Sequence, residues 1–379
     1  MNTNDVEIWC DETLPELYDE AMFDLEETSE DVWEAVVAAM EPLLEAIEDE
    51  EDREEFADHL TEAARDWFRA HHTTVLDLIE PVANATITTL CNKPQTAQHS
   101  ADWYAQRRNR LTASEFSQIL DGRRGALLKQ KISAETGDRV MTAPVGIAQS
   151  DGNMNATLWG HRFEPITRRI YEFEIAGVDT VCDTLGRFTH TTIPWISASP
   201  DGLVMKGPLA GRLVEIKSPK SRQPGDFVPV EYYVQMQVQM EVCNLDVAEF
   251  VEAQFQQRFD EFMTEDDVAD CEKARWKGRI EVRGILEDPA TWRYRYSEPA
   301  EDLEDAIFAE QGTHPILESS IWWLTGWYPR TVLRSAAWWN SVGWPNAQLF
   351  WAEVQSLRNA PQQVTPPVKE QTGWIGSNT

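Results

Sequence analysis

The sequence predicts an α/β protein, and three observations support this fold class. Residues 101–262 alternate helical and strand-like hydrophobic patterns, as in an α/β core. Residues 278–297 alternate polar and apolar residues, which predicts two strands. Residues 1–95 repeat apolar residues at helical spacing. Residues 316–358 hold seven of the sixteen tryptophans, and we predict that this segment is helical.

The first 95 residues are predicted to form two or three packed helices. Residues 28–31 (Thr-Ser-Glu-Asp) are a candidate N-cap cluster before the first of them. The apolar positions follow the helical period in two stripes: Val32, Val36, Met40, Leu43 and Ile47, then Phe56, Leu60, Ala64, Trp67 and Phe68. We interpret this region chiefly as a solvated accessory bundle, with docking of a partner or mimicry of DNA as the alternative.

Changes in composition divide the chain into three parts. We predict an acidic helical accessory region over residues 1–97, a main domain over 98–358 with an aromatic-rich C-terminal extension, and a disordered tail over 359–379. Residues 92–100 are polar, contain Pro94 and are predicted to be a linker.

Composition excludes several protein classes. No run of about 18 apolar residues exists, so no membrane span is expected. The acidic first residues lack the basic and apolar regions of a secretory signal, which predicts an intracellular, unsecreted protein. The five cysteines form no C-x-x-C pair, so we expect neither a disulfide framework nor a zinc site.

The net charge of −32 would by itself repel phosphate. The charge is unevenly placed, however. Residues 1–95 hold 27 acidic and 4 basic residues, a net of −23, which leaves −9 for the remaining residues. A local basic surface in the main domain is therefore compatible with the composition.

A predicted hairpin carries the candidate chemistry. The turn former Ser199-Pro200-Asp201-Gly202 and the strand pattern 213–217 are separated by Gly207, Pro208 and Gly211. In the second strand, Val214 and Ile216 point to one side, and Glu215 and Lys217 to the other. The hairpin would bring Asp201 and Glu215 close to Lys217. Each motif alone is an ordinary turn or surface ion pair, but together they suit a hard divalent cation and a positioned water.

Two further segments are predicted to complete this site. Glu164 follows Trp159-Gly160 near the start of a predicted helix, where it could bind metal, cap the helix or pair with Arg168. In residues 232–240, Tyr233, Met236 and Met240 form a core stripe. Tyr232, Gln235 and Gln239 occupy the neighbouring face and would face the site.

The most basic stretch of the chain lies upstream, in residues 103–131. Arg107, Arg110 and Ser114 stand beside a predicted helix start that Thr112 or Ser114 would cap, an arrangement suited to phosphate. Contacts to a DNA backbone are expected there, and the later bases of the stretch are Arg123, Arg124, Lys129 and Lys131.

In this order and spacing, the motifs resemble the YqaJ/lambda-exonuclease family of viral recombinases, of the PD-(D/E)xK nuclease superfamily. The resemblance covers roughly residues 101–260, and the later part is similar to longer members from large DNA viruses. It implies a restriction-endonuclease-like core, a central mixed sheet flanked by helices. It also implies 5′→3′ digestion of linear double-stranded DNA with Mg²⁺, for which Mn²⁺ can substitute.

The resemblance also implies roles for single residues. Asp201, Glu215 and the Ile216 carbonyl would bind metal with help from Glu164, and Lys217 would position the attacking water. Tyr232 and Gln235 would support that lysine. Arg107, Ser114 and Arg110 would hold the DNA end and its 5′ phosphate. Where the family often has Cys after the lysine, this chain has Ser218.

The resemblance further implies DNA ends as the partner, a single-strand annealing protein, a ring-shaped trimer, and action in the cytoplasm or nucleus of an infected cell. Two alternatives stay open. One is an endonuclease or junction-cleaving enzyme of the same superfamily, and the other is a non-catalytic DNA-binding protein on a nuclease scaffold. His161, beside Glu164, is interpreted as a surface or supporting residue, because an oxygen-ligand metal site does not need it.

Overall fold

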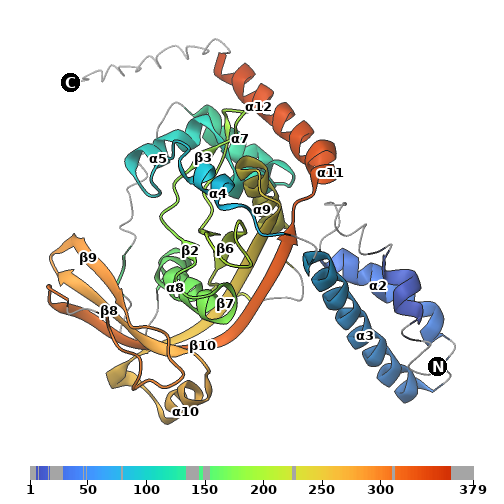
Figure 1. Cartoon of the computed structure of the whole chain (residues 1–379), viewed down its shortest axis with the longest axis horizontal. Helices are drawn as coiled ribbons and strands as arrows, with labels where there is room; N and C mark the ends of the chain where they lie inside the picture. The colour runs from blue at the N-terminus through green and yellow to red at the C-terminus, as the bar shows by residue number, and fades with distance from the viewer. Residues whose placement is uncertain are drawn as a thin grey trace, which may run out of the picture.

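In the computed structural model of the chain, the described residues are 6, 8–15, 17, 29–45, 47, 49–77, 80–133, 145–147, 154–223, 228–309 and 312–359. They form a mixed α/β fold, as predicted. Two sheets, of seven and three strands, lie among helices (Figure 1). The predicted tail lies outside the described residues apart from Asn359, and no helix among the described residues has the length and hydrophobicity to cross a bilayer.

The seven-stranded sheet has the order β2-β5-β6-β7-β10-β8-β9. Its strands are β2 (Val181–Cys182), β5 (Gly202–Val204), β6 (Leu213–Lys217), β7 (Val247–Phe259), β8 (Lys277–Ile285), β9 (Asp288–Tyr296) and β10 (Ile316–Leu333). The β6–β7 pair is parallel and the other pairs are antiparallel, so the sheet is mixed. The smaller sheet joins β1 (Leu111–Thr112), β4 (Ile196–Ala198) and β3 (Phe188–Thr189).

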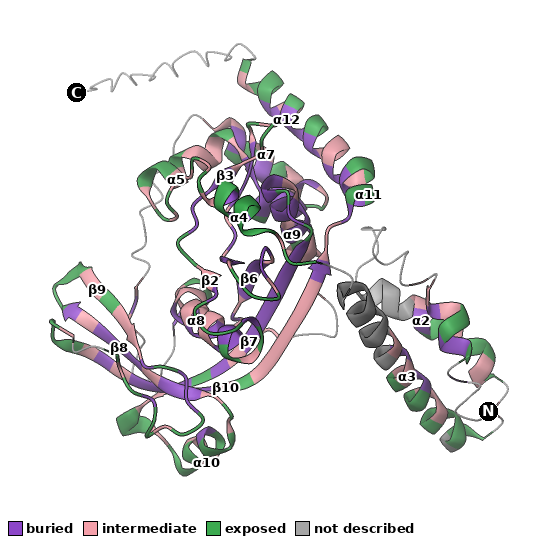
Figure 2. Ribbon diagram, viewed as in Figure 1, coloured by how far each residue is buried: buried purple, intermediate pink, exposed green. Residues whose placement is uncertain are grey.

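Helices cover both faces of the central strands. The helix α8 (Ala156–Tyr171), continued by a π-helical turn at Glu172–Ala176, packs Phe163 against Phe255 of β7 and lies on one face. The helix α9 (Val230–Cys243) lies on the other, with Met236 and Met240 fully buried as predicted. Strands β6 and β7 are therefore buried on both sides (Figure 2), although each also carries polar residues, such as the buried Glu215 and Glu249.

The remaining helices surround this core. They are α4 (Asn84–Cys91), α5 (Ala101–Gln106), α6 (Ala113–Phe116), α7 (Arg124–Ile132), α10 (Glu265–Lys273), α11 (Ala336–Trp338) and α12 (Trp344–Asn359), with short 3-10 turns at Arg107–Asn109, Ser117–Ile119 and Asp260–Phe262 and a π-helical turn at Trp339–Gly343. The predicted linker is not free of the core: Thr96 forms a β-bridge with Arg187.

In the acidic region, α2 (Ser29–Leu44) and α3 (Glu50–Asp77) lie side by side (Figure 1). Their predicted stripe residues Val36, Met40, Leu60 and Ala64 are buried in a cluster of their own with Leu14 and other residues of the first helical segment. The predicted helices are therefore present, and they bury their apolar stripes against one another.

The predicted helix over residues 316–358 is wrong in its first half, where β10 runs for 18 residues. Trp322 and Trp323 are consecutive and both buried, because opposite faces of the strand are covered. Trp322 packs with Phe255 and the α8 side, whereas Trp323 packs with Cys271 of α10. A strand covered on both faces loses the polar–apolar alternation that marks a half-exposed strand.

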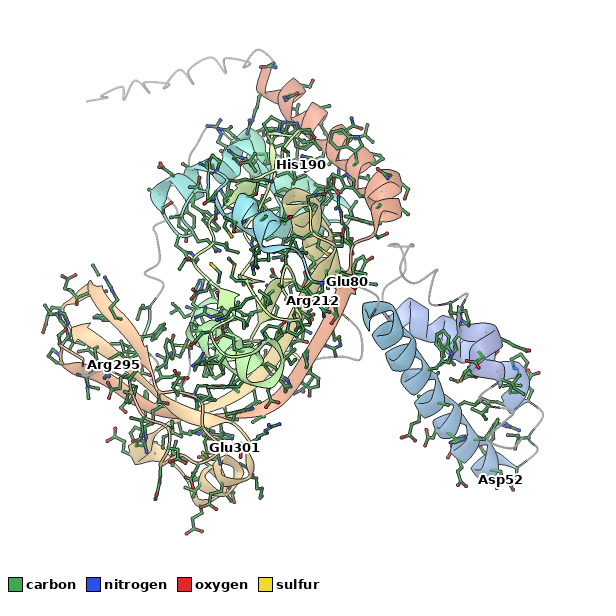
Figure 3. All side chains as sticks on the ribbon, in the orientation of Figure 1. Asp52, Glu80, His190, Arg212, Arg295 and Glu301 are labelled. Carbon is green, nitrogen blue, oxygen red and sulfur yellow. The ribbon has the colours of Figure 1, made fainter. Side chains whose placement is uncertain are left out.

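The predicted hairpin is confirmed. Gly202 pairs with Val214 and Leu203 with Leu213, in antiparallel register. Its turn is anchored twice: Val82 N donates to Ala210 O at 2.9 Å, and Arg212, labelled in Figure 3, pairs with the buried Glu249 of β7 at 2.7 Å. The turn that brings the two strands together is thus fixed against both the N-terminal segment and the sheet.

Replacing Gly211 by Ala should destabilise the protein more than replacing Gly207. Both glycines have positive φ, +92° and +88°, so each alanine would incur backbone strain of about 1–3 kcal/mol. A Cβ at Gly211 would also lie 2.3 Å from Cγ2 of Val82, whereas nothing lies within 4 Å at Gly207. The free energy of unfolding of both variants is measured with denaturant, and the difference between them gives the cost of the steric clash at Gly211. Equal losses would contradict the anchoring of the turn by Val82. Val82→Gly in the Gly211→Ala background removes both clashing carbons, Cγ2 and Cβ, and should recover part of the steric loss.

Candidate active site

The strand β6 supplies Glu215 and Lys217, and its alternation sorts the side chains as predicted. Val214 and Ile216 pack with Tyr171 and Val251 on the α8 side. Glu215 points the other way, towards α9, and is only 1% exposed. A carboxylate so deeply buried needs partners for both oxygens.

Three donors meet the two oxygens of Glu215. Lys217 Nζ and Gln235 Nε2, the latter at 2.6 Å, donate to Oε1. Gln239 Nε2 donates to Oε2, also at 2.6 Å. The predicted polar face of α9 therefore lies on the predicted polar face of β6, and the Oε1 atom of Gln239 is left buried without a partner in the structure.

Asp201 stands at the start of the neighbouring strand. Its Oδ2 accepts a hydrogen bond from Ile216 N at 2.8 Å, which holds the carboxylate beside β6. Burial raises the pKa of Asp201 well above its usual value, and the charges of Glu215 and Glu164 raise it further. The hairpin thus brings Asp201, Glu215 and Lys217 together as the spacing predicts.

Glu164 also belongs to this neighbourhood. Burial raises its pKa, opposed by Lys217 and Arg168 and reinforced by Glu215. The prediction that it lies near a helix start is wrong: α8 begins at Ala156 with Asn155 as its N-cap, so Glu164 lies in mid-helix. Arg168 pairs instead with Asp183, at 2.7 Å.

Lys217 remains protonated. Burial would lower its pKa, but the carboxylates of Glu215 and Asp201 outweigh burial and raise the pKa above its usual value. Its Nζ also lies 5.0 Å from the centre of the Tyr232 ring, which stacks on Phe250. Arg222 lies over the same ring at 5.6 Å, so Tyr232 contacts two cations.

The acidic groups do not form a ready-made metal cage. Among the described residues, no three His, Cys, Asp or Glu side chains are grouped closely enough to hold a metal ion. Lys217 and the two glutamines meet both oxygens of Glu215. The donor chemistry nevertheless suits a divalent cation, because three carboxylates facing one ammonium leave two negative charges uncompensated.

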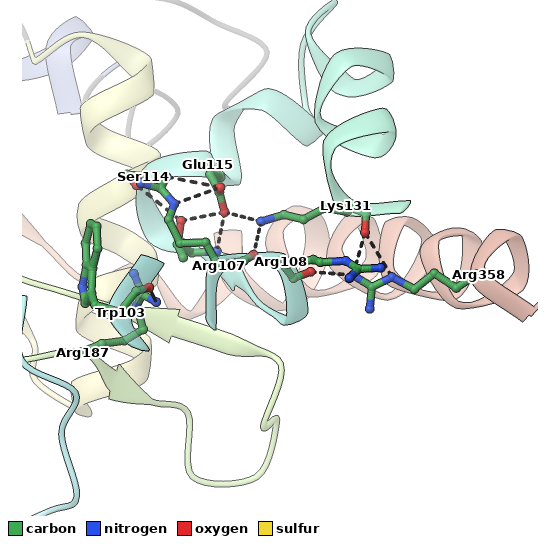
Figure 4. Close-up of polar contacts among 9 residues, drawn as sticks. Trp103, Arg107, Arg108, Ser114, Glu115, Lys131, Arg187 and Arg358 are labelled. Atoms are coloured by element: carbon green, nitrogen blue, oxygen red, sulfur yellow. Dashed lines mark hydrogen bonds and ion pairs between the residues drawn. The ribbon is translucent and has the colours of Figure 1, made fainter. Parts of the chain in front are cut away.

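The basic stretch folds around the start of α6. Glu115, 2% exposed, accepts from Arg107 at 3.2 Å and from Lys131 Nζ at 2.7 Å (Figure 4). Glu115 also reaches back to Thr112 N at 3.1 Å, so Thr112 rather than Ser114 caps the helix. Ser114 is exposed, and its Oγ lies 3.3 Å from Thr112 Oγ1.

Several other basic residues of this stretch form ion pairs or hydrogen bonds with other parts of the protein. Lys131 is fully buried, so the expectation that it contacts a DNA backbone is wrong. Arg123 pairs with Asp121 and Glu231, and Arg124 pairs with Glu353. Arg110 donates to Thr189 Oγ1 and to Pro194 O.

A hydrogen bond joins the basic stretch to the acidic site. Trp103 Nε1 donates to Ser199 Oγ at 3.0 Å, two residues before Asp201. The guanidinium groups of Arg107 and Arg187 lie 5.5 Å and 4.4 Å from the Trp103 ring centre. Sequence patterns could not identify Arg187, because the β-bridge that places it joins residues 91 positions apart. Glu115, by contrast, stands three residues after Thr112, the spacing of a capping box.

The C-terminal tryptophans lie in the core. Trp322, Trp323 and Trp338 are fully buried or nearly so, and Trp339 and Trp351 pack with α6 and Trp195. His161 packs edge-on against His99, with ring centres 5.3 Å apart, and burial lowers its pKa.

Comparison with known proteins agrees with the motif order. Residues 102–246 match the model of the YqaJ-like viral recombinase domain. An uncharacterized protein of Acanthamoeba polyphaga mimivirus is 27% identical over 183 residues, which are 45% of this chain and 31% of that protein. The chain thus spans about a third of the length of this viral relative.

Two solved structures were also matched. An alkaline exonuclease from Laribacter hongkongensis, and the same protein in complex with dAMP, are each 19% identical to this chain. Each match covers 68% of this chain and 93% of the other, with TM-scores of 0.37 and 0.36.

Proposed function

We propose that residues 102–246, which match the model of the YqaJ-like viral recombinase domain, form such a domain and that the protein is a magnesium-dependent exodeoxyribonuclease. It would hydrolyse linear double-stranded DNA from its ends in the 5′→3′ direction, in the recombination or repair of viral DNA. The observation that supports this most is the buried contact of Glu215 with Lys217, Gln235 and Gln239, next to Asp201.

The proposed metal ligands are Asp201, Glu215, Glu164 and the carbonyl oxygen of Ile216. A bound Mg²⁺, or Mn²⁺ in its place, would polarise the scissile phosphate and lower the pKa of a water. Asp201 is held in place by Ile216 N, and Gln235 and Gln239 fix the orientation of Glu215. The acidic side chains are thus oriented by the backbone and by α9.

Lys217 is the proposed residue that positions the attacking water and stabilises charge on the phosphate. In the metal-free protein, the carboxylates of Glu215 and Asp201 raise its pKa and so favour its charged form. Tyr232 and Gln235 keep it near Glu215, Tyr232 through its ring and Gln235 through the shared carboxylate oxygen. Arg107, Ser114 and Arg110 are proposed to bind the 5′ phosphate.

The test uses purified full-length protein with two substrates, a 5′-phosphorylated linear duplex and a covalently closed circle. With Mg²⁺, the linear duplex should disappear from its 5′ ends while the circle survives, and chelator or Asp201→Asn should stop the reaction. Cleavage of the circle would favour an endonuclease. Linear DNA that stays intact with Mg²⁺ or Mn²⁺ would refute the catalytic proposal.

Metal affinity should weaken as the pH falls. The pKa values of Asp201 and Glu164 are raised in the metal-free protein, chiefly by burial, so a cation must displace protons at acidic pH. Below these raised pKa values, affinity should fall by up to about tenfold per pH unit for each proton displaced. Calorimetric titration with Mn²⁺ across a pH series measures the effect. A flat profile between acid and alkaline pH would contradict the assignment of these ligands.

A further inference from the structure

Four cations gather behind the start of α6, and we call Arg107, Arg110, Lys131 and Arg187 the basic cluster. Arg107 and Lys131 share the carboxylate of Glu115 (Figure 4). Arg110 and Arg187 donate to hydroxyl or carbonyl oxygens instead: Arg110 to Thr189 and Pro194, and Arg187 Nη1 to Trp103 O at 2.5 Å. The cluster therefore holds more positive charge than its carboxylate neutralises, in a chain whose net charge is −32.

The positive charges of the basic cluster repel one another. Burial, together with the charges of Arg107 and Arg110, lowers the pKa of Arg187 to about 10, although the charge of Glu115 opposes them. Burial also lowers the pKa of Lys131, to which Arg107 and Arg187 contribute. Buried like charges that disfavour one another are stabilised by a bound anion.

Arg187 has the least-satisfied side chain of the cluster. The residue is 2% exposed, and its Nε is buried without a hydrogen-bond partner in the structure. A buried unpaired guanidinium N–H costs free energy unless a ligand or water meets it. The backbone of Arg187 is nevertheless fixed, because Arg187 N donates to Thr96 O at 2.8 Å.

Trp103 connects Arg187 to the exposed part of the site. Its ring contacts both guanidinium groups, Arg187 at 4.4 Å and Arg107 at 5.5 Å, and its Nε1 reaches Ser199. Removing Arg187 would therefore leave Trp103 and Arg107 without the cation that packs against the indole.

We propose that Arg187 is a positioning residue that gives the site its preference for a 5′-phosphoryl end. It acts through Trp103 and Arg107, which it holds in place, and through its buried charge, which strengthens attraction of a phosphate dianion. Lys131 contributes in the same way by neutralising Glu115, so that Arg107 keeps binding capacity. The inference rests on the proposed function, because it refines the terminal-phosphate site of that enzyme.

The test separates binding from cleavage. Affinity of the full-length protein is measured in chelator for two duplexes that differ only in a 5′ phosphoryl or 5′ hydroxyl end. Wild type should prefer the phosphoryl end, and Arg187→Gln should lower that preference by about tenfold or more, with a shallower salt dependence. Arg187→Lys, which keeps the charge, should recover part of the preference. Arg334→Gln, at a cation paired with Glu241 and Asp246, is the matched control and should keep all of it.

The possible outcomes distinguish the proposed role of Arg187 from the proposed nuclease activity. An Arg187→Gln protein that melts cooperatively and retains the full preference overturns the proposal, as does equal weakening towards both ends. If Arg187→Gln does not fold, Arg187→Lys carries the test, and a preference unchanged from wild type in that folded variant overturns the role of the guanidinium. Wild type that prefers phosphoryl ends but does not cleave with Mg²⁺ would refute the nuclease proposal and leave the phosphate site standing.

Discussion

Glu215→Gln should reduce the rate of DNA hydrolysis by on the order of 10³-fold while leaving the protein folded. The substitution keeps the size of the side chain and its ability to accept from Gln235 or Gln239. It removes the charge that pairs with Lys217 and would bind the metal. Single-turnover cleavage of a linear duplex at saturating protein measures the loss.

The matched control for this variant is Glu281→Gln. Glu281 is a buried glutamate of the same sheet, in β8, and it pairs with Arg283 and Arg295 rather than with residues of the site. Its replacement should cost stability and leave the rate per folded molecule near that of wild type. Comparable loss of rate in both variants would mean that burying any neutral glutamine in this sheet disturbs the site, and the assignment of Glu215 would fail.

Arg162→Met should destabilise the main domain by about 3–5 kcal/mol, the largest stability effect that we expect from a single substitution. Arg162 and Glu318 are both fully or nearly buried, and Nη1 to Oε1 and Nη2 to Oε2 distances of 2.6 Å and 3.1 Å make the pair bidentate. Arg162 also donates to Gly146 O at 2.9 Å and lies over the Tyr294 ring. Removing the arginine leaves the carboxylate of Glu318 buried without its counter-charge.

Denaturant unfolding measures this loss. The double variant Arg162→Met/Glu318→Leu is the decisive comparison, because replacing both charges of a buried pair is often nearly neutral. It should therefore be more stable than Arg162→Met alone. If the free energy of unfolding of the single variant lies within about 1 kcal/mol of the wild-type value, the ion pair does not contribute significantly to the contact between α8 and β10.

The arrangement of the candidate site could be predicted because it is local in the sequence. Asp201, Glu215 and Lys217 belong to one hairpin, so strand periodicity and turn residues were enough to bring them together. The polar face of α9 was predicted in the same way, from helical spacing alone. Local periodicity indicates which side chains share a face, and in this protein the polar face of β6 lies against the polar face of α9.

What the sequence could not predict depends on long-range packing. The sequence of β10 was predicted to be helical because it lacks the alternation of polar and apolar residues that marks a half-exposed strand. It lacks this alternation because α8 and α10 cover opposite faces of the strand. Arg187 enters the basic cluster through a bridge to Thr96, and Lys131 is withdrawn from solvent by Glu115. No spacing rule specifies such pairings, because the partner residues are set by the topology of the sheet.

The pairing of β10 also constrains how the protein can be made. From Ser320 to Leu333 this strand pairs with β7, the strand next to β6. During synthesis from the N-terminus, β7 therefore leaves the ribosome with one edge unpaired and stays so until residue 333 has followed. Unpaired edges of apolar strands invite association with other chains. The nascent protein thus carries an incomplete central sheet while about 70 more residues are translated, which at typical synthesis rates takes several seconds.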